Sequence, residues 1–196
     1  MDRNTLLGMT TGAAVMFGFG IVWLLLGLFR GRPSPRWLRT SLVAVGMALA
    51  TSIAMLAMRA FKLPFDLVPP TPQQLAMNHE ISRRFYIIFG LELAAIFVAV
   101  VVLNAIHYPD YILSGIALIV AVHFYPLAAL FQAPLYYGTA LVGSAVALFG
   151  FFMADAALRQ KIVGLSFGLL LWATGAWIVF VGLTAAPKVG PNLRPM

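Results

Sequence analysis

The chain has 196 residues and a formal net charge of +7, and 62% of its residues are hydrophobic while only 10% are charged. Soluble domains contain roughly 45–50% apolar and about 25% charged residues, so this composition excludes an ordinary soluble domain and indicates an integral membrane protein. Cysteine is absent, which excludes disulfide bonds and sulfur-ligated metal sites.

Apolar runs near the ~20 residues that cross a bilayer as a helix occur six times along the chain. They cover residues 8–29, 40–60, 85–106, 111–131, 135–154 and 162–185. Proline and charged residues separate these runs, as helix ends require. The sequence therefore predicts one all-α domain over residues 1–196, an integral membrane bundle of six transmembrane helices.

The long separator before the third run predicts an additional interfacial helix at about residues 72–84. The segment Thr71–Gln74 supplies a capping residue, a first-turn proline and the third-position partner of a capping box, so we expect a helix to begin at Pro72. Glu80 can pair with Arg84 at helical spacing. We expect this segment to lie at the membrane interface and to lead into the third span; the alternative is a solvated extension that serves only as an anchor.

The basic residues that flank the six spans give little information about orientation. Six of them fall on the side that carries the 30–39 and 159–161 connections, and seven fall on the other side. The first span has four arginines after it and only Arg3 before it. Because basic flanks favour the cytoplasmic side, we expect a multi-pass protein of the cell membrane with both termini outside. The positive flanks suggest anionic lipid headgroups as partners rather than nucleic acid.

Two ionisable residues, Glu92 and His123, lie well inside the predicted spans. Charged groups in the membrane are costly and are functional candidates by default. Counted from the middle of the turn between Tyr108 and Pro109, Glu92 lies about 16.5 residues back and His123 about 14.5 residues forward. This is a depth difference of roughly 3 Å. The two side chains could therefore pair and share a proton, whereas the alternative is that His123 is a satisfied packing residue.

Further polar candidates lie towards the membrane face at which the second span ends and the third span begins. Pro126 follows His123 by three residues and should leave the carbonyl of Val122 without its helical donor. Bent helices beside polar groups occur at substrate sites in transporters. The candidate binding residues around a vestibule are Glu92, His123, Tyr125, Arg84, Arg59, Tyr136 and Tyr137. The alternatives are an aromatic interface belt for the tyrosines and snorkelling for the arginines.

The last span carries a glycine seam that consists of Gly164, Gly168, Gly175 and Gly182. At 100° per residue these positions fall within about 40° of one another, and Gly164 with Gly168 forms a GxxxG motif. Such a stripe lets another helix approach closely. The seam could serve the bundle itself or a homo-oligomer.

The segment His123–Tyr137, "HFYPLAALFQAPLYY", has a histidine, a proline and then a second proline ahead of aromatic residues. It resembles a segment of small uncharacterised bacterial multi-pass membrane proteins. This resemblance implies a six-helix bacterial membrane protein and implies no activity.

Three hypotheses for the function remain open from the sequence. The first is a small permease or channel in which Glu92 and His123 bind a proton, an ion or a small polar solute. The second is a non-catalytic membrane subunit or scaffold that binds lipid or a partner protein. The third is a lipid-active enzyme with His123 as general base and Arg59 or Arg84 holding a headgroup phosphate. The enzyme has the weakest support, because no nucleophile or metal cluster accompanies the histidine, and we expect no cofactor or metal.

Overall fold

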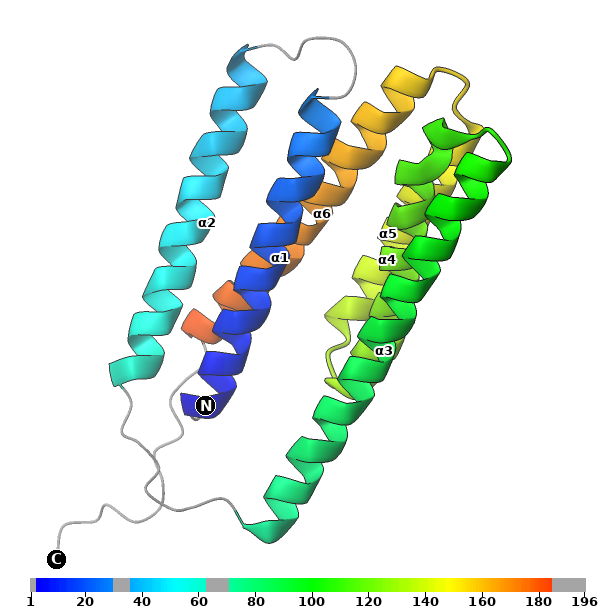
Figure 1. Ribbon diagram of the computed structural model, residues 1–196. Helices are drawn as coiled ribbons and strands as arrows, with labels where there is room; N and C mark the ends of the chain where they lie inside the picture. Colours follow the sequence, from blue (N-terminus) through cyan, green and yellow to red (C-terminus); the bar gives the residue numbers. More distant parts are fainter. Residues whose placement is uncertain (1–2, 30–35, 63–70, 185–196) are drawn as a thin grey trace, which may run out of the picture.

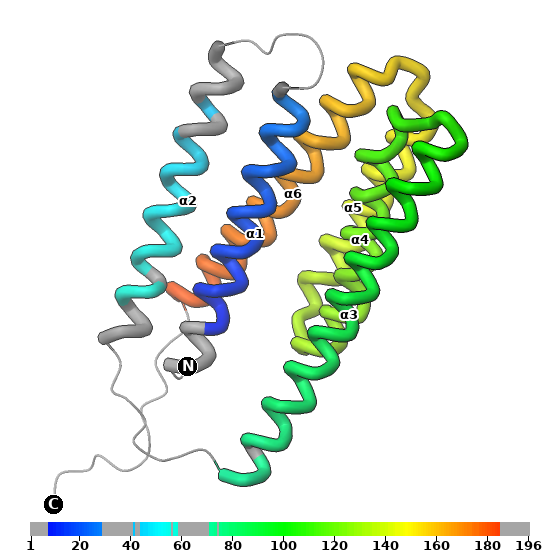
Figure 2. Tube along the Cα trace, in the orientation of Figure 1, coloured from blue at the N-terminus to red at the C-terminus, as the bar shows by residue number. Residues whose placement is uncertain are grey.

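The computed structural model describes residues 3–29, 36–62 and 71–184, and these residues are almost entirely helical. The elements are α1 (Arg3–Phe29), α2 (Arg36–Lys62), α3 (Pro72–Ala105), the short 3₁₀ helix η1 (Pro109–Tyr111), α4 (Ile112–Leu130), α5 (Leu135–Phe152) and α6 (Ala156–Thr184). No strand occurs in the described part of the chain, which confirms the all-α fold class. Figure 2 traces the path of the chain through these helices.

Five helical segments are long and apolar enough to cross a membrane. They are Gly8–Leu28, Leu75–Ala105, Pro109–Leu130, Leu135–Phe152 and Ala156–Thr184. In α2 the apolar stretch within the described residues is Ala44–Met55, which is shorter than one bilayer crossing. A multi-pass membrane protein is therefore supported, and the sixth crossing through α2 stays a prediction.

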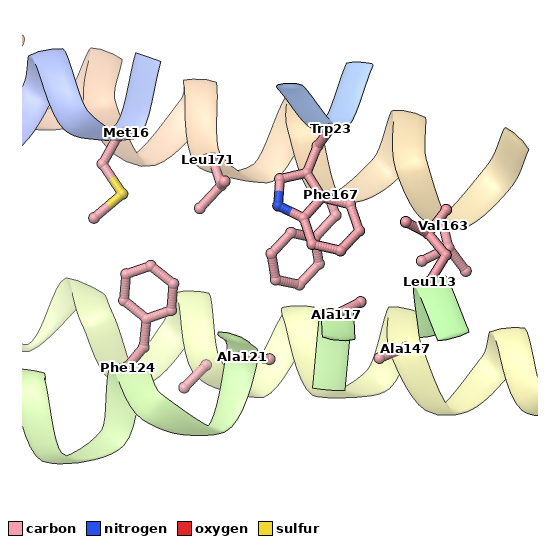
Figure 3. Close-up of a cluster of buried hydrophobic side chains, with 11 residues drawn as sticks. Met16, Trp23, Leu113, Ala117, Ala121, Phe124, Ala147, Val163, Phe167 and Leu171 are labelled. Atoms are coloured by element: carbon pink, nitrogen blue, oxygen red, sulfur yellow. The ribbon is translucent and has the colours of Figure 1, made fainter. Parts of the chain in front are cut away.

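The helices are arranged around two closely packed pairs, α1 with α6 and α4 with α5 (Figure 1). On one side α2 packs against α1 and α6, and on the other side α3 packs against α4. The core lies between the two pairs, where Trp23 and Phe167 stand with ring centroids 4.6 Å apart and face Ala117 and Ala121 (Figure 3). Small residues on α4 and α5 leave room for these large rings, which fixes how the two pairs meet.

The predicted interfacial helix is not a separate element. It forms the first turns of α3, one continuous helix of 34 residues that begins at Pro72 as expected. Between Pro72 and Ala105 no second proline interrupts the helical hydrogen bonds. At 1.5 Å per residue α3 is about 51 Å long, compared with ~30 Å for the hydrocarbon core of a bilayer. The helix is therefore longer than one perpendicular crossing of a bilayer requires. The side chain of Gln74 lies outside those that the structure describes.

The third and fourth spans form the tight hairpin that the sequence predicts. After Ala105 the chain reverses through His107, which has a φ of 62°, and Pro109 begins η1. The amide of Tyr108 donates to the carbonyl of Leu103 at 2.8 Å and closes the end of α3. This turn holds α3 and α4 side by side and antiparallel (Figure 1).

The glycine seam of α6 packs against α1 of the same chain. A Cβ atom at Gly164 would lie 2.6 Å from the backbone of Gly27, and one at Gly168 would lie 2.9 Å from the carbonyl oxygen of Gly20. Gly175 faces Ala13 across the same interface. All three of these glycines therefore face α1 of the same chain. The sequence had left open whether this face of α6 contacts a second copy of the protein. The backbones can approach closely where Gly164 meets Gly27, because neither residue has a side chain there.

Candidate functional site

The structure brings Glu92 and His123 into contact between α3 and α4. His123 Nδ1 lies 3.2 Å from Glu92 Oε1, and the two side chains are 17% and 8% exposed, respectively. Their similar distances from the Pro109 turn account for their similar depth. The rotation of the two helices, which the sequence left open, turns both side chains into the shared interface.

The surroundings of the imidazole determine which ring nitrogen donates. His123 Nδ1 lies 2.6 Å from the carbonyl oxygen of Val120, one turn earlier on α4. Nδ1 therefore has two oxygen acceptors within reach, from Val120 and Glu92. A nitrogen between two acceptors carries the proton, so the tautomer assigned from these contacts has N–H at Nδ1. Nε2 is then the nitrogen that binds or releases a proton.

Aromatic rings connect this pair to the core of the bundle. The ring centroid of Phe124 lies 4.6 Å from that of His123 and 5.6 Å from that of Tyr136. Phe124 is 2% exposed and belongs to the central core cluster, against which Tyr136 packs. The imidazole is therefore held on one side by the packed core and on the other by the carboxylate of Glu92. Sequence reasoning missed Val120 and Phe124, because neither residue type signals a site.

Pro126 lies inside α4 as predicted. Its ring nitrogen has no hydrogen to donate to the carbonyl of Val122. The carbonyl that the imidazole contacts is nevertheless that of Val120. The imidazole therefore contacts the carbonyl of Val120, and not the carbonyl of Val122 that the proline leaves without its helical donor.

Among the described residues, no hydrogen bond, ion pair or ring contact joins Arg84, Tyr125 or Tyr137 to Glu92 or His123. Arg84 binds Glu80 with Nε to Oε1 at 2.8 Å, and its side chain is 64% exposed. Tyr125 and Tyr137 are exposed, with ring centroids 6.2 Å apart. The aromatic belt that we gave as the alternative stays a prediction for these two residues. The side chain of Arg59 lies outside those that the structure describes.

The packing between the helices leaves little internal space. The crevice between α1, α2 and α6, lined by residues that include Phe17, Ile53 and Trp172, has no interior volume that a water molecule can occupy. Glu92 and His123 do not line it. Within the described residues, no group of three or more histidine, aspartate and glutamate side chains is placed to hold a metal ion.

Comparisons of the chain with protein families, with curated proteins and with solved structures found no match. The resemblance of His123–Tyr137 to small bacterial membrane proteins therefore has no support from relatives. The long apolar helices are consistent with a multi-pass membrane protein, and any function has to be argued from the side chains.

Proposed function

We propose that the protein is a small proton-linked permease of the cell membrane, and that the Glu92 and His123 pair binds the proton. The observation that carries this proposal is the 3.2 Å contact between two ionisable side chains on apolar, membrane-length helices. An ionisable pair within the membrane is costly to keep unless it has a role.

The contacts of the pair support a specific division of roles. Nδ1 of His123 is held by the carbonyl of Val120 and the carboxylate of Glu92. A proton arriving at Nε2 would make the imidazole cationic, and the adjacent carboxylate would stabilise that charge. Loss of the proton returns a neutral imidazole beside the carboxylate. Glu92 thus holds and orients the imidazole of His123, which takes up and releases the proton, as a carboxylate does for histidine in many proton-transfer sites.

The position of α3 supports a way to expose the pair. None of the span within α3 is buried inside the molecule, and this helix packs mainly against α4 (Figure 1). Most of its surface therefore has no partner within the described chain. A tilt of α3 would break mainly its contacts with α4, including those that cover Glu92 and His123, and it would open the pair toward one membrane face.

The topology follows from the same proposal. Six crossings, with α2 as the sixth, place both termini on one side, and the flanks of α1 favour the outside. The basic flanks bind anionic headgroups.

A second candidate function is a non-catalytic membrane subunit that docks on a partner through α3. The observation that favours it is the exposed apolar surface of α3, which includes Tyr86, Phe89 and Phe97. In that case the Glu92 and His123 pair only fixes α3 to α4.

Reconstitution into liposomes that contain a pH-sensitive dye distinguishes these functions. We expect pH-dependent proton or solute flux in the wild type, no pH dependence in Glu92→Gln, and no flux in His123→Ala. The matched controls are Glu80→Gln and His79→Ala, which change the same residue types at exposed positions of α3. Flux that is absent from the wild type, or equal in all five proteins, would contradict the permease. Lower stability without any change in flux would favour the subunit.

A further inference from the structure

A buried arginine lies at the opposite end of the bundle from the N-terminus of α3, in the first turns of α6. Arg159 is only 3% exposed. Its Nε and Nη1 atoms are buried, and neither has a hydrogen-bond partner among the described residues. Buried guanidinium groups are normally paired, because an unsatisfied charged donor is costly.

The contacts of Arg159 hold its guanidinium in a fixed orientation. Its Cζ lies 3.7 Å from the ring centroid of Tyr111. The Tyr111 ring also stacks on the ring of Phe151, with ring centroids 5.7 Å apart and an angle of 6° between the ring planes. Stacking engages the face of the guanidinium and leaves the N–H groups at its edges free to donate.

A second unpaired polar atom lies one turn deeper. Ser114 Oγ is fully buried and also has no hydrogen-bond partner in the described part of the chain. It lies against Gly150, which also contacts Val163 of α6. Since Ser114 follows Tyr111 by three residues and Val163 follows Arg159 by four, both unpaired groups lie along the same α4 and α6 contact.

The positive charge of the guanidinium determines which class of ligand this group would take. Asp155 uses Oδ1 to accept the amide hydrogen of Leu158 at 3.0 Å, and both residues are exposed, so the first turn of α6 lies at the surface of this end. The last turn of α1 and the first turn of α2 lie at the same end of the bundle (Figure 1), and Arg36 and Arg39 belong to the first turns of α2. An unpaired guanidinium favours an oxyanion, which accepts charge-assisted hydrogen bonds from its N–H groups.

The geometry points to Arg159, stacked on Tyr111, as a binding site for a phosphate group, either the headgroup of a membrane phospholipid or a soluble phosphate. Tyr111 precedes His123 by 12 residues, about 18 Å along the helix. The phosphate site is therefore distinct from the Glu92 and His123 pair and does not depend on the proposed transport.

Ligand-induced stabilisation of the purified full chain in non-ionic detergent tests this site. The probes are phosphatidylglycerol, inorganic phosphate, and diacylglycerol as a lipid without phosphate. Phosphatidylglycerol should raise the melting temperature of the wild type, whereas diacylglycerol should not. A comparable rise with inorganic phosphate identifies a soluble phosphate as sufficient, and a rise with phosphatidylglycerol alone identifies a headgroup site. A wild type that responds to none of the probes, or equally to diacylglycerol, overturns the proposal.

Two variants locate the site. Arg159→Gln should raise the apparent Kd for the phosphate probe by about tenfold or more, because hydrogen bonds to a charged donor are lost. Lys161→Gln removes a basic residue two positions further along α6 and should leave the Kd unchanged. An equal loss in both variants, or none in Arg159→Gln, would mean nonspecific charge attraction. Hydrogen exchange of the wild type gives a test that needs no variant: the probe should protect amides at the start of α4 and of α6, and protection confined to other regions would refute the site.

Discussion

Replacing Gly164 with alanine tests whether the contact between α1 and α6 holds the bundle together. The added Cβ would lie 2.6 Å from the Cα and N atoms of Gly27 and 3.0 Å from the carbonyl oxygen of Trp23. All three atoms are backbone, so no side chain can move aside. Carbon atoms in contact are ~3.5 Å apart, and the helices would therefore have to separate by about 1 Å.

The expected cost follows from this overlap. Extra methyl groups forced into a packed interior lower stability by about 1–3 kcal/mol. The matched control is Gly18→Ala on α1, where a Cβ would meet no atom of the described residues within 4 Å. Removing a helical glycine there should instead stabilise the protein by roughly 0.5–1 kcal/mol. The two variants should thus differ by about 1.5–4 kcal/mol.

Tryptophan fluorescence during unfolding in mixed micelles measures this difference, because Trp23 of α1 and Trp172 of α6 are buried and Trp172 lies against Gly20 of α1. For a chain of this size each kcal/mol shifts the melting temperature by roughly 2–4 °C. A Gly164→Ala protein as stable as Gly18→Ala would refute the reasoning, because it would mean that α1 and α6 are not in backbone contact.

Three further predictions concern other contacts. Thr139 and Thr174 share a buried hydrogen bond of 2.9 Å, so valine at either position alone should cost about 1–3 kcal/mol, while valine at both should cost much less, as a double-mutant cycle would show. Phe167→Ala removes a ring with no exposed surface and should cost about 3–5 kcal/mol in the same unfolding assay; a smaller loss would contradict its place in the core. Glu80→Gln breaks exposed ion pairs with two arginines and should leave the melting temperature unchanged in high salt.

Several features of the fold could be predicted from the sequence because they depend on residues along one segment. Apolar length gives the candidate spans, proline and charge give their separators, and the Pro109 turn places Glu92 and His123 at one depth. The predicted positions of the helix ends were less accurate. For instance, α6 begins at Ala156 rather than at 162, because the helix continues into residues that are polar but compatible with helical geometry.

The features that only the tertiary structure decided depend on contacts between different helices. The sequence located the glycines of α6 but not their partners Gly20 and Gly27, which lie more than 130 residues earlier in the chain. It also placed Arg159 in the connection before the last span, whereas the structure places it in α6 and packing against Tyr111 buries the guanidinium. A helical repeat defines which residues share a face, but which neighbour that face meets is set by the fit of side chains from all the helices together. For this reason spacing could predict that Glu92 and His123 lie at one level, and only the rotation of α3 against α4 could bring them into contact.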